Sequence, residues 1–243
     1  RSFDEVFRLT EKGDARYCLI PIENSLAGSI YKNYDLLSRY RLRIVNEINL
    51  PIKHHLIVVP GVKFEEVVTV LSHPVALDQC EKFFIRHPQL ERKSAYDTSG
   101  SVKEIIEKGW RNCAAIAGRG AAEFYGGEIL SGIEDNQENF TRFLLLAGEM
   151  QVSDLSNKTS IVFSLRNVPG SLFKSLSVFA LRDIDLTKIE SRPIHGRPWQ
   201  YLFYIDLLGS IRETHVQKAL NHLEEITDFL EVLGCYPAAQ SDV

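Results

Sequence analysis

Apolar residues along the first 150 positions alternate between short runs and segments with helical spacing. The nearly continuous apolar run from Tyr17 to Ile22 predicts a strand buried on both faces. Further strands are expected at 67–71, 93–96, 113–117 and 141–147, and helices at 76–86, 101–108 and 119–125. Strands that alternate with helices predict a mostly parallel α/β sheet that binds ligands at the carboxyl ends of its strands.

The pattern changes after Met150, where the polar stretch 153–158 is the best linker candidate. Beyond it, we expect strands at 159–165, 186–190, 201–207 and 232–236 and helices at 171–181 and 215–230. This βαββαβ order is the ferredoxin-like split motif. The sequence therefore predicts two domains, 1–150 and 158–238.

Amino-acid composition and net charge restrict the kind of partner that the protein is expected to bind. The 243 residues are 44% hydrophobic, which suffices for globular cores, and 28 basic against 32 acidic residues give a formal net charge of −4. That balance argues against a nucleic-acid or anionic-membrane binder, because neither would meet a basic surface. The apolar stretches fall short of the roughly 20 residues that span a bilayer. A small-molecule partner is favoured.

Four scattered cysteines, without a C-x-x-C motif or a histidine at metal-ligand spacing, predict reduced thiols, no disulfide and no zinc site. They suit a cytosol-like compartment. The histidines His54, His55 and His195 have no partner that the sequence identifies, so we expect structural or surface roles for them.

Three clusters of polar side chains follow predicted strands, and a fourth stands at the start of one. The clusters are Glu23, Asn24 and Ser25; Ser72 to Pro74 with Gln79; Asp97 to Ser101 with Thr98 and Ser99; and the pair Thr141 and Arg142. Each of the first three clusters has an alternative interpretation, in which its side chains cap a helix, and the Thr141–Arg142 pair by itself is weak evidence. Junctions of one α/β layer would face a common crevice. Metal-ligand spacing, a phosphate loop and a nucleophile elbow are absent from them, so the predicted chemistry relies on hydrogen bonds and electrostatics.

In the second half, Gly170 opens a predicted helix whose first amides suit a carboxylate, although an ordinary turn is the alternative. Glu190 and Arg192 end the next predicted strand, and a solvated charge pair is the default interpretation there.

Taken together, these motifs resemble the prephenate dehydratase family, including its arogenate-using relatives, across essentially the whole chain. The motifs are Pro21-Ile22-Glu23-Asn24-Ser25, Ser72-His73-Pro74 with Gln79-Cys80, Asn139-Phe140-Thr141-Arg142-Phe143, Gly170-Ser171-Leu172-Phe173 and Glu190-Ser191-Arg192-Pro193. The resemblance implies a catalytic domain of two periplasmic-binding-protein-like lobes followed by a regulatory ACT domain that binds phenylalanine.

The implied reaction is that of a carbon–oxygen lyase. Prephenate loses carbon dioxide and hydroxide to give phenylpyruvate, without a cofactor or metal, because formation of the aromatic ring drives the step. The resemblance makes Thr141 the proton donor, with Glu23 and Asn24 as the other catalytic residues. Substrate-binding roles are implied for Ser25, Ser72, Gln79, Thr98, Ser99 and Arg142, although Arg142 alternatively braces its loop. Because a neutral threonine is a poor acid, preorganised dipoles must supply much of the effect.

For regulation, the resemblance implies feedback inhibition by L-phenylalanine in a homodimer or homotetramer, at an interface between ACT domains. The residues expected to bind it are Gly170, Ser171, Leu172, Phe173, Glu190, Ser191, Arg192 and Pro193.

Two departures from the family pattern stand out: a strand and Gly-rich turn expected before the helix at Ser2 are missing, and Val75 replaces a frequent glutamine. Arogenate remains an alternative substrate, and a non-catalytic amino-acid sensor is an alternative from another functional class. The short connection from Ile194 to Gln200 favours prephenate. The expected location is the cytoplasm, or the plastid in a photosynthetic eukaryote.

Overall fold

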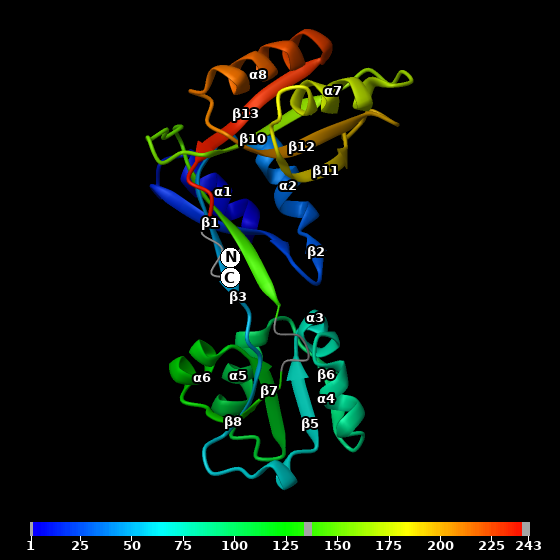
Figure 1. The fold of residues 1–243 in the computed structure, drawn as a ribbon. Coiled ribbons are helices and arrows are strands. Elements are labelled where there is room, and N and C mark those ends of the chain that lie inside the picture. The colour runs from blue at the N-terminus through cyan, green and yellow to red at the C-terminus, as the bar shows by residue number, and fades with distance from the viewer. Residues whose placement is uncertain (1, 134–137, 240–243) are drawn as a thin grey trace. The chain divides into compact units, whose positions relative to one another are not determined.

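The computed structural model describes residues 2–133 and 138–239. The chain forms two compact units, coloured along the sequence in Figure 1. The first comprises Arg1–Glu23, Ser29–Asn49 and Arg142–Val243, and the second comprises Asn24–Gly28 and Leu50–Thr141. The C-terminal domain therefore belongs to the same unit as the N-terminal strands and helices.

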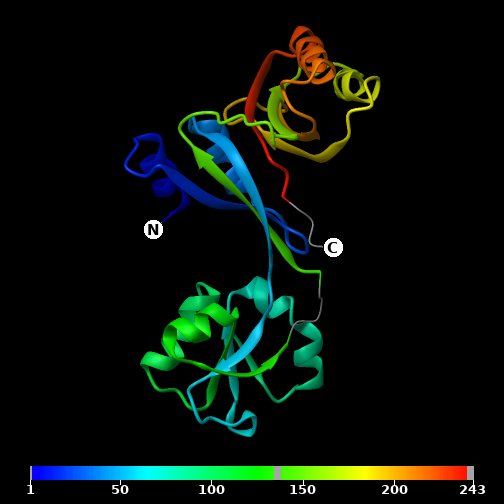
Figure 2. The same cartoon turned by 60° about the vertical axis from the view of Figure 1, so that its left-hand side comes forward.

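The C-terminal part of the first unit has the predicted βαββαβ order. Its elements are β10 (Lys158–Ser164), α7 (Ser171–Ala180), β11 (Leu186–Pro193), β12 (Tyr201–Leu208), α8 (Thr214–Ile226) and β13 (Phe229–Tyr236). The strands lie in the order β11-β12-β10-β13, and β10 runs antiparallel to both neighbours. Both helices pack on one face of this sheet, where Val178, Phe179, Val216, Ala219 and Leu223 bury against the strands (Figure 2).

The N-terminal elements extend this sheet to eight strands, in the order β11-β12-β10-β13-β3-β9-β1-β2. They are α1 (Phe3–Glu11), β1 (Tyr17–Asn24), β2 (Gly28–Ser29), α2 (Tyr31–Arg39), β3 (Arg43–Pro51) and β9 (Phe140–Ala147). Where β13 meets β3, Gly234 pairs with Ile44. A Cβ on Gly234 would lie 2.1 Å from the Ile44 carbonyl oxygen, so this close approach requires glycine.

Strand β1 corrects one prediction. Cys18, Ile20 and Ile22 are buried, but Leu19 between them is 48% exposed. The strand therefore buries one face, against α1 and α2, and its apolar run was wrongly taken to be buried on both faces.

The second unit is a separate five-stranded sheet between two layers of helices. Its elements are β4 (His55–Val58), η1 (Phe64–Glu66), β5 (Thr69–Ser72), α3 (Pro74–Asp78), α4 (Glu81–Arg86), β6 (Glu91–Ser94), α5 (Thr98–Glu107), β7 (Cys113–Ala117), α6 (Arg119–Tyr125) and β8 (Glu128–Gly132). Helices α3 and α4 cover one face, and α5 and α6 the other (Figure 1).

The strand order of the second unit is β6-β5-β7-β4-β8. Strands β5, β6 and β7 are parallel as predicted, but β4 runs antiparallel to both β7 and β8. The sheet is therefore mixed. No helix in the described part of the chain is long and apolar enough to cross a membrane.

Two helix boundaries of this unit differ from the predictions. The single helix expected at 76–86 is two helices, interrupted at Gln79 and Cys80. Helix α5 begins at Thr98 because Asp97 caps it by accepting a hydrogen bond from the Gly100 amide. Ser101, expected to cap the helix, instead donates its hydroxyl to the Asp97 carbonyl inside the first turn.

Candidate functional site

Two predicted catalytic residues, Asn24 and Thr141, meet in the second unit. The Asn24 side-chain amide nitrogen lies 3.1 Å from the Thr141 hydroxyl oxygen and 3.0 Å from the Phe140 carbonyl oxygen. It also lies 2.7 Å from the side-chain oxygen of Asn139, which the predictions did not include among the site residues. Thr141 is only 9% exposed, so its hydroxyl sits in a sheltered polar setting.

Asn24 also holds the turn that follows β1. Its side-chain oxygen accepts hydrogen bonds from the Leu26 amide at 3.1 Å and the Ala27 amide at 2.8 Å. Asn24 therefore does not cap a helix, since α2 begins only at Tyr31, and it holds this turn in addition to its contact with Thr141. Ser25 is used by the backbone, since its hydroxyl donates to the Glu138 carbonyl and accepts from the Phe140 amide.

Gln79, at the interruption between α3 and α4, completes the group. Its side-chain oxygen lies 2.9 Å from Nε2 of His54 and 3.1 Å from the Asn139 amide nitrogen. Its own amide nitrogen lies 3.4 Å from the Asn24 side-chain oxygen. His54, expected to be only structural or on the surface, is therefore a buried member of this polar cluster.

A cavity of about 460 Å³ adjoins Gln79 and is lined by Leu26, Ala27, Val75 and Asp78 as well. Val75 thus faces the cavity at the position where the family often has glutamine. All five lining residues belong to the second unit.

Three other residues predicted to bind substrate do not join this hydrogen-bonded group within the described part of the chain. Ser72 is fully buried and donates its hydroxyl to the Ile116 carbonyl at 2.7 Å, so this hydroxyl ties β5 to β7. Thr98 and Ser99 lie in the first turn of α5. Within the described ranges, no hydrogen bond joins these two residues to Asn24, Gln79 or Thr141, and their role stays a prediction.

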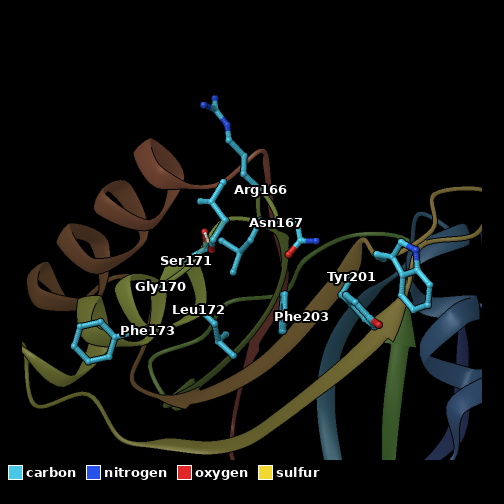
Figure 3. Close-up of a pocket in the computed structure, with 11 residues that line it drawn as sticks. Arg166, Asn167, Gly170, Ser171, Leu172, Phe173, Tyr201 and Phe203 are labelled. Atoms are coloured by element: carbon cyan, nitrogen blue, oxygen red, sulfur yellow. Dashed lines mark hydrogen bonds between the residues drawn. The ribbon is translucent and has the colours of Figure 1, made fainter.

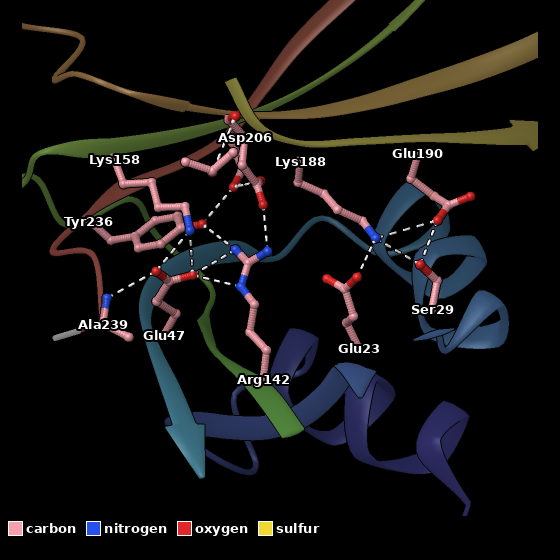
Figure 4. A network of polar contacts seen from close by, with 12 residues as sticks. Glu23, Ser29, Glu47, Arg142, Lys158, Lys188, Glu190, Asp206, Tyr236 and Ala239 are labelled. Carbon is pink, nitrogen blue, oxygen red and sulfur yellow. Dashed lines mark hydrogen bonds and ion pairs between the residues drawn. The ribbon is translucent and has the colours of Figure 1, made fainter. Parts of the chain in front are cut away.

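Glu23, the third predicted catalytic residue, is paired with the C-terminal domain of its own unit. Lys188 on β11 contacts a Glu23 carboxylate oxygen at 2.7 Å, the Ser29 hydroxyl at 2.9 Å and Glu190 at 3.6 Å (Figure 4). Ser29 in turn donates to the Glu190 carboxylate. The lysine thus fixes the Glu23 carboxylate. Nothing in the sequence around Lys188 indicated this contact.

Arg142, predicted to bind substrate or to brace its loop, has its guanidinium occupied by the protein's own carboxylates. Its nitrogens lie 2.6 Å from Glu47 and 2.5 Å from Asp206, and Tyr236 contacts it at 3.2 Å (Figure 4). Lys158 pairs with Glu47 at 2.9 Å. The alternative of a bracing role fits: these residues come from β3, β9, β10, β12 and β13 and connect the two halves of the eight-stranded sheet.

Burial and neighbouring charges both shift the pKa values of Arg142 and Tyr236. Burial by itself would lower the pKa of Arg142, but attraction by Asp206 and Glu47 raises that pKa above its ordinary value. Burial raises the pKa of Tyr236 well above its ordinary value, and the Asp206 charge adds to this effect. The arginine is therefore charged and the tyrosine protonated at neutral pH.

A second cavity, of about 310 Å³, lies in the C-terminal domain (Figure 3). The predicted residues Gly170, Ser171, Leu172 and Phe173 line it, as do Leu165, Arg166, Asn167, Val168, Trp199, Tyr201 and Phe203. Gly170 has φ +82°, a left-handed conformation that favours glycine just before α7. The aromatic residues after position 198 were missed, because exposed aromatics at alternate strand positions do not by themselves indicate a pocket.

The predicted phenylalanine-binding residues at the end of β11 do not line that cavity. The Glu190 carboxylate contacts Ser29 and Lys188, and Arg192 forms a two-pronged ion pair with Asp35, with both distances 2.9 Å. Within this chain, their side chains are therefore directed to the N-terminal elements. Among the described residues, no three His, Cys, Asp or Glu side chains come together as a metal site.

Comparison with known proteins agrees with these features. The prephenate dehydratase family model matches residues 1–151, and the ACT domain model matches residues 159–225. Arogenate dehydratase/prephenate dehydratase 1, chloroplastic, of Arabidopsis thaliana is 46% identical over 97% of this chain. Arogenate dehydratase 2 of Petunia hybrida is 45% identical over the same share. The chain spans 64% of the length of each of these two relatives.

Solved structures share the fold across nearly the whole chain. Prephenate dehydratase of Arthrobacter aurescens, in complex with L-Phe, has a TM-score of 0.89 at 31% identity and covers 99% of this chain and 80% of its own. GqqA, described as a novel type of quorum quenching acylase, has a TM-score of 0.90 at 29% identity, with coverages of 98% and 88%. The expected fold class is confirmed: the chain belongs to the prephenate dehydratase family, with the family's α/β catalytic fold followed by an ACT domain.

Proposed function

We propose that this chain is a carbon–oxygen lyase that converts prephenate to phenylpyruvate, a step of L-phenylalanine biosynthesis. The observation that carries the proposal is the Asn24–Thr141 contact, in which the threonine oxygen accepts from the amide at 3.1 Å. Within the described ranges, no residue accepts the threonine's hydroxyl proton, so the proton is available to a ligand.

In the proposed reaction, the bond to the carboxylate carbon breaks as carbon dioxide leaves, and its electron pair completes the aromatic ring. The ring C–O bond breaks at the same time, and the hydroxide departs with the electron pair of this C–O bond. Thr141 donates a hydrogen bond to this leaving oxygen, while the amide dipoles of Asn24 and Gln79 are held in place before the reaction begins. Preorganised dipoles of this kind cost no reorganisation in the transition state.

Arogenate is the alternative substrate, because the relatives with 45–46% identity are named for it. No residue of the site distinguishes a keto from an amino side chain. A non-catalytic sensor is the second alternative, since the likeness to a protein described as an acylase illustrates that this fold does not fix one activity.

A direct assay tests the proposal. The purified chain is supplied with prephenate and, separately, with arogenate, and phenylpyruvate and phenylalanine are quantified. We expect turnover of at least one substrate without added metal or cofactor. Turnover of neither by a folded protein that still binds phenylalanine would favour the sensor.

The proposal includes feedback inhibition by L-phenylalanine in the 310 Å³ cavity. The first amides of α7 suit its carboxylate, and Tyr201 and Phe203 offer apolar surface for its ring. The end of β11, with Ser191 and Pro193, remains in the proposal as a surface for a second ACT domain in a homodimer or homotetramer. Support comes from β11 being the end strand of the described sheet.

Phenylalanine binding gives a specific prediction. Gly170→Val should abolish the binding that calorimetry detects in the parent, because a β-branched residue is strained at φ +82° and displaces the start of α7. Gly61→Val is the matched control, since Gly61 has φ +77°, also has open space around it and lies in the other unit. The control should retain binding. Equal phenylalanine affinity in Gly170→Val and the parent would contradict the proposed site.

For the domain boundaries, we retain 1–150 and 158–238 as the proposed division by activity. The names of the Arabidopsis relatives include a chloroplast location, which supports the plastid over the cytoplasm as the place of action.

A further inference from the structure

We propose that His54 is a positioning residue that, together with Asn139, fixes the side-chain amide of Gln79, which lines the adjoining cavity and faces Asn24, the partner of Thr141. The inference rests on the proposed function, in which Thr141 assists the departing hydroxide. It adds a residue that does not itself line the adjoining cavity but contacts Gln79, which does.

The argument starts from backbone groups, whose donor and acceptor roles are fixed. The backbone amides of Leu26 and Ala27 both donate to one side-chain atom of Asn24, so that atom is the oxygen. The other side-chain atom lies 3.0 Å from the Phe140 carbonyl oxygen and is therefore the nitrogen. Asn24 thus has only one orientation that satisfies its neighbours.

The orientation of Asn24 fixes the orientations of the side-chain amides of Asn139 and Gln79. Because the Asn24 nitrogen donates to Asn139 at 2.7 Å, the contacted atom of Asn139 is its oxygen. The Asn139 nitrogen then faces Gln79 at 3.1 Å and needs an acceptor there, which makes the contacted atom of Gln79 its oxygen. The Gln79 nitrogen consequently faces the Asn24 oxygen, at 3.4 Å.

This series of side-chain hydrogen bonds ends at His54. Nε2 of His54 lies 2.9 Å from the Gln79 oxygen, which is an acceptor, so Nε2 carries the proton. The other ring nitrogen, Nδ1, is buried and has no hydrogen-bond partner in the described structure. A buried lone pair without a partner is better tolerated than a buried N–H without an acceptor. Both ring nitrogens therefore indicate the Nε2–H tautomer.

The orientation of Asn24 also determines how Thr141 is hydrogen-bonded. Its oxygen accepts a hydrogen bond from the Asn24 nitrogen, so its own proton points away from Asn24. His54 and Asn139 both donate to the Gln79 oxygen, so together they fix the Gln79 side chain, whose nitrogen faces the Asn24 oxygen at 3.4 Å. Removal of His54 leaves the Gln79 oxygen with one fewer donor, so the Gln79 amide can rotate and its dipole is no longer preorganised beside the cavity.

The test compares His54→Leu with His54→Gln in the full chain. Glutamine places an amide donor near the position of Nε2, whereas leucine has none. We expect His54→Leu to lower kcat about tenfold or more with KM changed less than about twofold, since displaced catalytic groups mainly affect the transition state. His54→Gln should recover most of the loss. His55→Leu, the same change at the adjacent histidine, should leave kcat near that of the parent.

Circular dichroism of each variant separates loss of folding from loss of positioning. A kcat in folded His54→Leu within twofold of the parent, or equal losses in the leucine and glutamine variants, would overturn the inference. Nitrogen-15 NMR of histidine-labelled protein supplies a readout that does not need turnover, with the His54 signals identified by their absence in His54→Gln. The Nε2–H tautomer is expected. Observation of the Nδ1–H tautomer overturns the inference even if the chain proves inactive, whereas inactivity toward both substrates overturns only the proposed function.

Discussion

Replacing Thr141 with alanine is expected to lower kcat by about 10² or more, with a smaller change in KM. Its hydroxyl oxygen is held by Asn24 at 3.1 Å, and its proton is unclaimed by any residue in the described part of the chain. A donor placed in this way acts mainly as the leaving oxygen gains charge, so its loss affects the transition state more than substrate binding. Steady-state kinetics with the substrate that the parent turns over will measure the effect.

Two further substitutions make this prediction specific. Thr141→Ser retains a hydroxyl and should keep most of the activity, whereas Thr141→Val retains the shape without the hydroxyl and should resemble alanine. Because Thr141 is only 9% exposed, the valine variant also controls for packing. A kcat within threefold of the parent in both Thr141→Ala and Thr141→Val would remove Thr141 from the catalytic role.

Part of this site could be predicted because strand ends are visible in the sequence. Asn24 and Thr141 adjoin apolar runs, and the rule that ligands bind at strand ends brought them together with Gln79. His54 could not be found in this way, since it precedes a short strand that was not predicted and meets Gln79 25 positions away. Ser72 shows the opposite error: a hydroxyl at a strand end can be used up by the neighbouring strand.

The missed elements of the fold have a related cause. Strand β3 carries charged and polar residues within its length, including Glu47, so its pattern does not resemble a buried strand. Glu47 is nevertheless 5% exposed, because Arg142 and Lys158 neutralise it from strands far away in the sequence. Periodicity reports local burial and cannot show a charge that is buried by distant partners.

Loss of the Arg142 guanidinium is expected to cost about 3–5 kcal/mol of the free energy of unfolding, the usual consequence of removing one partner from a buried ion pair. In Arg142→Met, Asp206 loses its ion-pair partner, and Glu47 retains Lys158. Urea unfolding followed by circular dichroism measures the change. The matched control is Asp154→Asn, which breaks the pair with Arg212 where the Asp154 side chain is 98% exposed, and should leave stability nearly unchanged.

A third variant distinguishes the net stability that the ion pair contributes from the stability that is lost when only one partner is removed. Replacing Arg142 and Asp206 together, by methionine and leucine, removes both charges and should recover much of the stability lost in Arg142→Met, because no uncompensated carboxylate then remains at position 206. Recovery would indicate that the pair contributes little net stability and serves to fix how β3 and β9 are joined to the strands of the ACT domain, one residue beyond Thr141. If instead Arg142→Met changes the free energy of unfolding by less than about 1 kcal/mol, a magnitude typical of exposed pairs, the network does not brace this junction.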